Sequence, residues 1–161
     1  MMTMILYFTS TARFWAIAGV PYNRVDAEIL RRQIGNLTTD ADFLIHLGDI
    51  KAGRSSCDGD RFEEVRQNME LLTVPVLMVI GENEYNDCED NEEALRSWRR
   101  KFAHLHLHEK LENSHRNENY NGGMLDVSIM PGRNESFYFV LKKTLFIGLN
   151  IVCWWWNMPG G

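Results

Sequence analysis

The sequence is short of the residues that mark several classes of protein. Its 161 residues include three cysteines and four prolines, and no run of eighteen apolar residues occurs. A disulfide scaffold, a proline-rich chain and a membrane-spanning helix are therefore not expected. The first twenty residues also lack the basic start and the cleavage pattern of a signal peptide, which favours a cytoplasmic protein over a secreted one.

Basic side chains are missing from one stretch in the middle of the chain. Residues 82–93 contain seven carboxylates and neither lysine nor arginine. Such a stretch repels phosphate backbones, so a nucleic-acid partner is not expected. Clustered carboxylate oxygens are also ligands for divalent cations, and the alternative is a solvated acidic loop that leads into a helix.

The overall composition is that of a globular protein of one domain. Hydrophobic residues make up 45% of the chain, charged residues make up 24%, and the formal net charge is −5. We therefore expect one domain over residues 1–161. Residues 1–12 form a lead-in and residues 153–161 an irregular tail rich in tryptophan.

Hydrophobic periodicity predicts strands alternating with helices over the first hundred residues. The apolar runs span 13–19, 42–48 and 74–80, and the segments of helical periodicity span 23–35, 60–72 and 90–102. Asn23, Asp60 and Asp90 stand where side chains cap helix N-termini. This alternation predicts an α/β fold that begins with parallel βαβ units. The later apolar runs, over 124–130, 137–141 and 144–152, predict antiparallel strands with a hairpin turn at Lys142-Lys143.

Carboxylates directly follow two of the expected parallel strands. Asp49 comes after Gly48, and Glu82 comes after Gly81. Because the carboxyl ends of parallel strands meet at one edge of a sheet, we expect both carboxylates at one rim. Two carboxylates there suit a divalent metal, or a general acid and base, although Asp and Glu are also ordinary turn residues.

The same two regions resemble a known family. Residues 43–53 read Phe-Leu-Ile-His-Leu-Gly-Asp-Ile-Lys-Ala-Gly, and residues 81–88 read Gly-Glu-Asn-Glu-Tyr-Asn-Asp-Cys. Together they are similar to the second and third sequence blocks of the calcineurin-like metallophosphoesterases. The second of them resembles the branch that has Gly-Asp-Asn-Glu-Trp-x-Asp-Cys at this place.

The resemblance implies a layered αββα domain that hydrolyses phosphate esters with two divalent metals, which are Mn, Fe, Zn or Co. Asp49 matches the carboxylate that bridges both metals, and Glu82 matches a metal ligand of the third block. Asn83 falls where the family has a histidine that contacts the substrate; an asparagine can donate a hydrogen bond there but cannot act as a general acid.

The chain also departs from the family pattern. Val20 stands where the first block has a metal-binding aspartate, and no histidine follows His115 to supply the later ligands. We therefore expect a degenerate member, truncated at its C-terminus, with an incomplete second sheet. Hydrolysis is expected to be impaired, and whether the metals are retained stays open. The alternatives are a non-catalytic interaction module, or a fragment that keeps the fold.

Several other residues leave alternatives open. Cys57 and Cys88 follow the two loops and form either a disulfide or two free thiols. His104, His106 and His108 would share one face of a strand, where a polar exposed edge is favoured over a metal site. His46 is expected to be a hydrogen-bonded core histidine. Trp154–Trp156 suggests contact with a protein partner, and the alternative is an arbitrary tail.

Overall fold

The computed structural model describes residues 11–37, 41–57, 59–103 and 125–152. Their elements follow one another in chain order as β1 (Phe14–Ile17), α1 (Arg24–Gly35), β2 (Phe43–His46), α2 (Gly59–Met69), β3 (Val76–Met78), α3 (Asn91–Phe102), β4 (Ser128–Met130), β5 (Arg133–Leu141) and β6 (Thr144–Gly148). Within these ranges, no helix combines the length and the apolar character needed to cross a membrane.

The strands form two sheets of different kinds. β1, β2 and β3 pair in parallel and in sequence order, with Phe14 opposite Phe43 and Leu44 opposite Val76. β4, β5 and β6 form an antiparallel sheet, also in sequence order. The predicted order of parallel βαβ units followed by antiparallel strands is thus confirmed.

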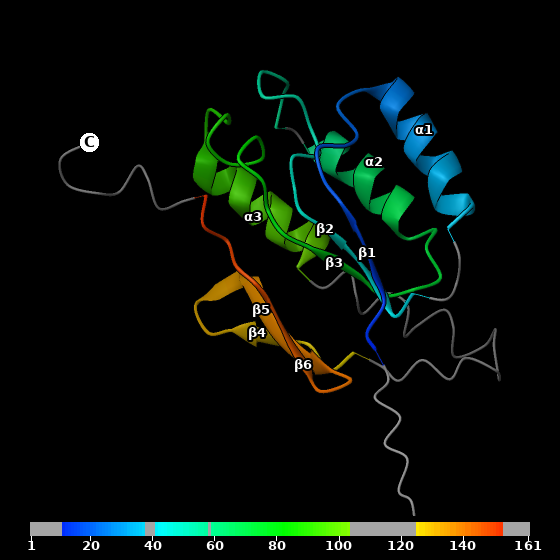
Figure 1. Ribbon diagram of the computed structural model, residues 1–161. Coiled ribbons are helices and arrows are strands. Elements are labelled where there is room, and N and C mark those ends of the chain that lie inside the picture. The colour runs from blue at the N-terminus through cyan, green and yellow to red at the C-terminus, as the bar shows by residue number, and fades with distance from the viewer. Residues whose placement is uncertain (1–10, 38–40, 58, 104–124, 153–161) are drawn as a thin grey trace, which may run out of the picture.

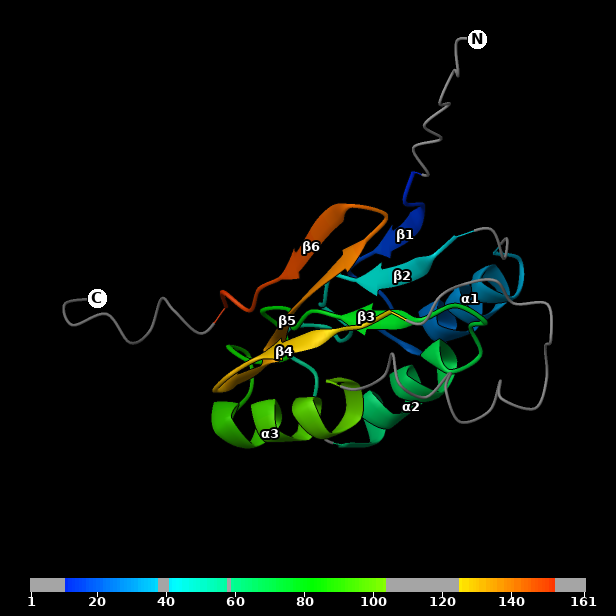
Figure 2. The same cartoon turned by 90° about the horizontal axis from the view of Figure 1, so that it is seen from below.

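The elements stack in layers. α1 and α2 lie over one face of the parallel sheet, and the antiparallel sheet lies over its other face (Figure 1). α3 packs beside α2, on the β3 side of the sheets, whereas β1 and β6 lie on the opposite side (Figure 2).

One core lies between the helices and the parallel sheet. α1 contributes Leu30 and Ile34, and α2 contributes Phe62, Val65 and Met69, at the three-to-four spacing of one helical face. The spacing places apolar side chains on one side only, so each helix lies on the sheet and keeps its charged side in water. This packing fixes the strands whose ends form the rim described below.

A second core lies between the two sheets and is rich in aromatic rings. Phe43 of β2 packs edge-to-face against Phe139 and Phe146, with ring centroids 5.2 and 5.1 Å apart. Leu77 and Phe137 belong to the same cluster. Because β2 and β3 are covered on both faces, they read as continuous apolar runs rather than alternating ones.

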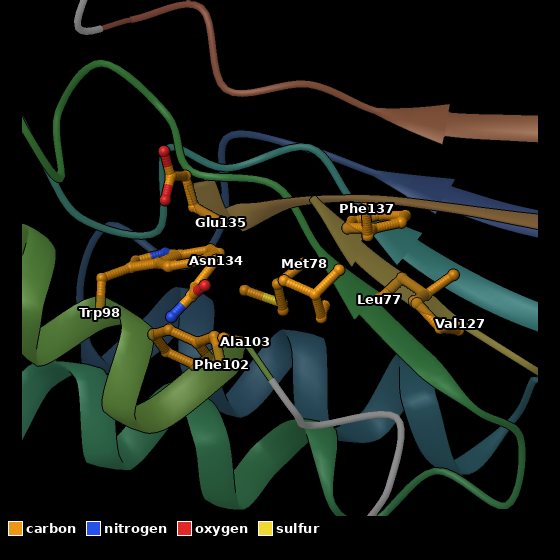
Figure 3. Close-up of a pocket in the computed structure, with 10 residues that line it drawn as sticks. Leu77, Met78, Trp98, Phe102, Ala103, Val127, Asn134, Glu135 and Phe137 are labelled. Atoms are coloured by element: carbon orange, nitrogen blue, oxygen red, sulfur yellow. The ribbon is translucent and has the colours of Figure 1, made fainter. Parts of the chain in front are cut away.

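α3 closes the seam between the two sheets on the β3 side. Trp98 and Phe102 of this helix line a small cavity of about 10 Å³ together with Met78 of β3 and Phe137 of β5 (Figure 3). Glu135 stands at the same seam and accepts hydrogen bonds from the Arg99 guanidinium at 2.6 and 2.9 Å. This ion pair between Arg99 and Glu135 links α3 to β5 at the edge of the cavity.

The order of the elements agrees with the sequence-based prediction, while several boundaries differ. α2 ends at Met69 rather than 72, and β4 begins at Ser128 rather than 124. Asn23 and Asp90 cap α1 and α3 as predicted. Asp60 does not cap α2, because the helix begins one residue earlier, at Gly59. β5 begins at Arg133 rather than 137, since buried Glu135 and Ser136 find partners in Arg99 and Asn150. β6 ends at Gly148 rather than 152, where Asn150 bonds to the Ser136 hydroxyl in place of a ladder partner.

Candidate functional site

The loops after β1, β2 and β3 meet at one rim of the parallel sheet. The Gly19 N–H donates to the Gly48 carbonyl at 3.0 Å. Gly48 has φ +88°, and a Cβ on it would lie 2.3 Å from the Gly81 nitrogen. The second and third loops therefore touch through their backbones, which only glycine at both positions permits.

The Glu84 side chain links these two loops through hydrogen bonds to both. Its buried carboxylate accepts N–H hydrogen bonds from Gly81 at 2.7 Å, from Asp49 at 2.9 Å and from Ile50 at 2.5 Å. Burial raises the pKa of this carboxyl, and the three N–H donors oppose that rise. The sequence-based reasoning did not identify Glu84 as a site residue. The feature that could have identified it is the second acidic residue of the Gly-Glu-Asn-Glu loop.

Asp49 lies half-buried at the rim in a left-handed backbone conformation, with φ 58°. Its Oδ1 accepts the Asn83 N–H at 3.1 Å, so the predicted site residues Asp49 and Asn83 do come together. Glu82 is exposed to solvent beside them in sequence. The rim therefore presents one carboxylate that the backbone orients and one that extends into water.

The Asn83 side chain is turned toward the second loop. Its Nδ2 donates to the Lys51 carbonyl at 2.9 Å, and a Cβ on Gly53 would lie 3.4 Å from its Oδ1. The amide thus holds the loop after β2 in place. Its Nδ2 group is engaged by the protein itself.

Lys51 is a buried cation inside the second loop, which the sequence-based reasoning did not identify. Its ammonium donates to the carbonyls of Ala52 and Ser55 at 3.1 Å and of Gly53 at 3.3 Å. Burial lowers the pKa of Lys51, and the charges of Asp87, Glu84 and Asp49 oppose that shift. A fixed positive charge therefore already lies among the carboxylates of the rim.

The first loop has Val20 at the position where the family resemblance implies a metal-binding aspartate. The Val20 side chain packs against the core between the helices and the parallel sheet. Its carbonyl lies 2.8 Å from His46 Nε2, while His46 Nδ1 accepts the Gly48 N–H at 3.1 Å. This confirms His46 as a hydrogen-bonded core histidine. Burial lowers its pKa to about 4, so the ring is neutral at pH 7 and both of its nitrogens are engaged.

A disulfide between Cys57 and Cys88 links the second and third loops a few residues beyond the rim. Of the two alternatives that the sequence left open, the structure has the bridged one. The bridge lies along an open groove of about 370 Å³, whose lining includes Arg54, Asp87 and the Asp90 cap of α3.

The described rim does not fit a pair of divalent metals. Within residues 11–37, 41–57, 59–103 and 125–152, no group of three or more His, Cys, Asp or Glu side chains is placed to hold a metal ion. Val20 offers no donor atom, and both His46 nitrogens are used. Asp49 and Glu82 leave too few ligands for two ions, each of which takes four or more.

Three predicted features lie outside the described residues. These are the alternating histidines at 104, 106 and 108, the polar loop over 112–123, and the Trp154–Trp156 run.

Comparisons with protein-family models, with curated proteins and with solved structures found no match to this chain. The family resemblance therefore rests on the residues of the second and third loops.

Proposed function

We propose that this chain is a metallophosphoesterase-like domain in which hydrolysis of phosphate esters by a two-metal site is impaired. The observation that carries the proposal is the contact between the two loops that resemble the family. The Asn83 N–H donates to the Asp49 carboxylate at 3.1 Å, and Glu84 binds backbone N–H groups of both loops. A rim built this way holds a carboxylate at a fixed position, which is what a metal ligand needs.

Two further observations support impairment. The Val20 side chain packs into the core, so one ion of a pair would lack an anionic ligand. The Lys51 ammonium, held by three carbonyl groups, already supplies positive charge near Asp49. Loss of one ligand or of its supporting hydrogen bonds commonly costs 10–100-fold in metal affinity or activity.

The assay that tests this function is hydrolysis of an aryl phosphate monoester and an aryl phosphodiester with added Mn²⁺. We expect turnover near the buffer rate, because the described rim cannot place two ions on one phosphate. Any residual metal-dependent rate should disappear in Asp49→Ala and persist in Asp60→Ala, which changes an exposed carboxylate outside the rim. Rapid turnover that is lost in Asp49→Ala would overturn impairment, whereas a residual rate unaffected by Asp49→Ala would remove this rim from the function.

A non-catalytic interaction module is the second candidate. The observation that favours it is the set of exposed carboxylates between β3 and α3. They are Glu82, Asp87, Glu89 and Asp90, and the last three line the open groove. A module of this kind would bind a basic polypeptide with an affinity that falls steeply with salt, and would have no hydrolytic activity.

A further inference from the structure

The Cys57–Cys88 disulfide is open to solvent on one side. It lies along the groove of about 370 Å³ described above, which is large enough for a small molecule to approach the bridge. The two cysteines differ in exposure, since Cys57 is half-buried whereas Cys88 is only 7% exposed. An incoming thiolate therefore reaches the Cys57 sulfur more readily than the Cys88 sulfur.

The Cys88 sulfur lies where a free thiol would find a hydrogen-bond acceptor. Its Sγ atom is 3.3 Å from the Glu84 carbonyl oxygen and 3.8 Å from the Asn83 carbonyl oxygen. A thiol S–H at this position can donate to the Glu84 carbonyl. The loop after β3 thus offers a reduced Cys88 a partner at the place where the sulfur already lies.

The two rim loops do not depend on the disulfide alone for their contact. Glu84 accepts the N–H groups of Asp49 and Ile50 from one loop and of Gly81 from the other. The backbones of Gly48 and Gly81 also touch directly. The bridge can therefore open while the loops stay together, so reduction of the disulfide does not require the domain to unfold.

Acidic side chains line the groove beside the disulfide. The charged members of its lining are Asp87, Glu89, Asp90, Glu93 and Arg54. Glu93 is paired with Arg96 and Arg100 at 2.9 and 3.0 Å. The buried Lys51 ammonium is shared among three carboxylates, those of Asp87, Glu84 and Asp49. The groove therefore keeps a negative charge, which repels anionic thiols and attracts cationic ones.

We propose that this disulfide is a thiol-exchange site that reacts at Cys57 Sγ and takes small, positively charged thiols as its reductant. A thiolate attacks Cys57 Sγ and forms a mixed disulfide, while Cys88 Sγ leaves as a thiolate and takes a proton from water. A second thiolate then attacks the small-molecule sulfur of the mixed disulfide and releases the Cys57 thiolate. Two thiols are oxidised to one disulfide, and both cysteines are reduced. The inference does not rest on the proposed function, because it involves neither a metal nor a phosphate ester.

The test compares small thiols that differ in charge, namely cysteamine, 2-mercaptoethanol and 2-mercaptoethanesulfonate. All proteins carry Cys153→Ser, which leaves Cys57 and Cys88 as the only cysteines. Released thiols are alkylated and counted by mass spectrometry. Rate constants per thiolate are divided by those for a neutral small disulfide, which removes differences in nucleophilicity. We expect cysteamine to react about tenfold faster than the sulfonate at low salt, and the ratio to fall toward unity in about 1 M salt.

Matched variants locate the source of this preference. Asp87→Asn/Glu89→Gln removes two carboxylates from the groove lining and should reduce the preference for cysteamine several-fold. Glu28→Gln/Glu70→Gln changes the net charge equally at exposed positions on α1 and just after α2, and should leave the preference unchanged. If the first double variant does not fold, Glu89→Gln is compared with Glu28→Gln in the same way.

The position of the mixed disulfide and the dependence on thiol concentration complete the test. After rapid acid quenching, peptide mass spectrometry should find the cysteamine adduct on Cys57. An adduct found only on Cys88 would overturn the proposed point of attack. Equal rates for the three thiols, or rates that reach one common limit as thiol concentration rises, would overturn the site itself. Reduction would in that case depend on opening of the fold rather than on access through the groove.

Discussion

Glu84 contributes more hydrogen bonds to the rim than Asp49 or Glu82, the two carboxylates that the sequence predicts as metal ligands. One buried carboxylate satisfies the N–H groups of Gly81, Asp49 and Ile50, which belong to the separate loops after β3 and β2. Backbone donors that are buried without an acceptor cost about 1–3 kcal/mol each, so this one side chain supports the geometry of both loops.

Glu84→Gln should therefore destabilise the fold by about 2 kcal/mol or more. The amide has one acceptor oxygen instead of two, and its NH₂ group faces backbone donors. Urea unfolding at pH 7 measures the change. Glu82→Gln is the matched control, because Glu82 is exposed, and it should stay within about 0.5 kcal/mol of the parent. Equal stability of the two variants would contradict the role assigned to Glu84.

His46 makes the stability of the fold depend on pH. Burial lowers its pKa from 6.5 to about 4, so between these values the unfolded chain binds a proton that the folded chain does not. Stability from this group is therefore fully present above pH 6.5 and is lost as the pH falls toward 4, a change on the order of 3 kcal/mol.

The check is to compare urea unfolding of the parent and His46→Gln at pH 7 and pH 5. Glutamine can donate to the Val20 carbonyl and accept from Gly48, and it does not titrate. We expect the loss of stability on acidification to be smaller in the variant. An identical loss in both proteins would show that His46 is not the group responsible.

At the scale of elements, the rim depends on two loops that approach through glycines. A Cβ on Gly81 would lie 2.2 Å from the Asp49 nitrogen and 2.4 Å from its Oδ1. Neither group can move freely, because the Asp49 nitrogen bonds to Glu84 and the Oδ1 bonds to Asn83.

Gly81→Ala should consequently destabilise the fold by about 1–3 kcal/mol, as overpacking does elsewhere. Gly35→Ala provides the comparison, since no atom lies within 4 Å of the added Cβ at the end of α1. That variant should be neutral or more stable by about 0.5–1 kcal/mol. Thermal or urea unfolding of both variants measures the difference in their free energy of unfolding. A Gly81→Ala protein as stable as Gly35→Ala would show that the two loops can separate without loss of stability.

Much of the element order could be predicted because it depends on local pattern. The periodicity of Leu30 and Ile34, or of Phe62 and Val65, identifies a helical face without any knowledge of its neighbours. The beginning of β5 could not be predicted, because residues 134–136 are polar and become strand only when Arg99 and Asn150 supply partners from elsewhere in the chain.

The rim was predictable in part for the same reason. Asp49 and Asn83 follow strands, and strand ends in a parallel sheet meet at one edge, so their contact was foreseeable. Glu84 and Lys51 were not foreseen, since a buried charge is recognisable only from the partners that surround it. Charged residues are usually exposed, and sequence alone gave no reason to place these two inside.

At the scale of the whole molecule, the described residues form a layered α/β domain. Hydrogen bonds support its rim, and within those residues the rim brings together too few ligands for two metals. The helices and the two sheets hold the loops after β2 and β3 in contact. The loop after β1 packs the Val20 side chain against the core, and the end of β2 holds His46 as a neutral ring with both nitrogens hydrogen-bonded, so neither side chain offers a donor to a metal.

The most direct test is to count metal. The purified chain is equilibrated with Mn²⁺ and dialysed, and the metal per chain is measured by elemental mass spectrometry, with Asp49→Ala as the control. We expect the parent chain to retain less than one equivalent and Asp49→Ala not to differ from it. Two equivalents in the parent chain, lost in Asp49→Ala, would show that a complete two-metal site exists and would contradict an impaired site.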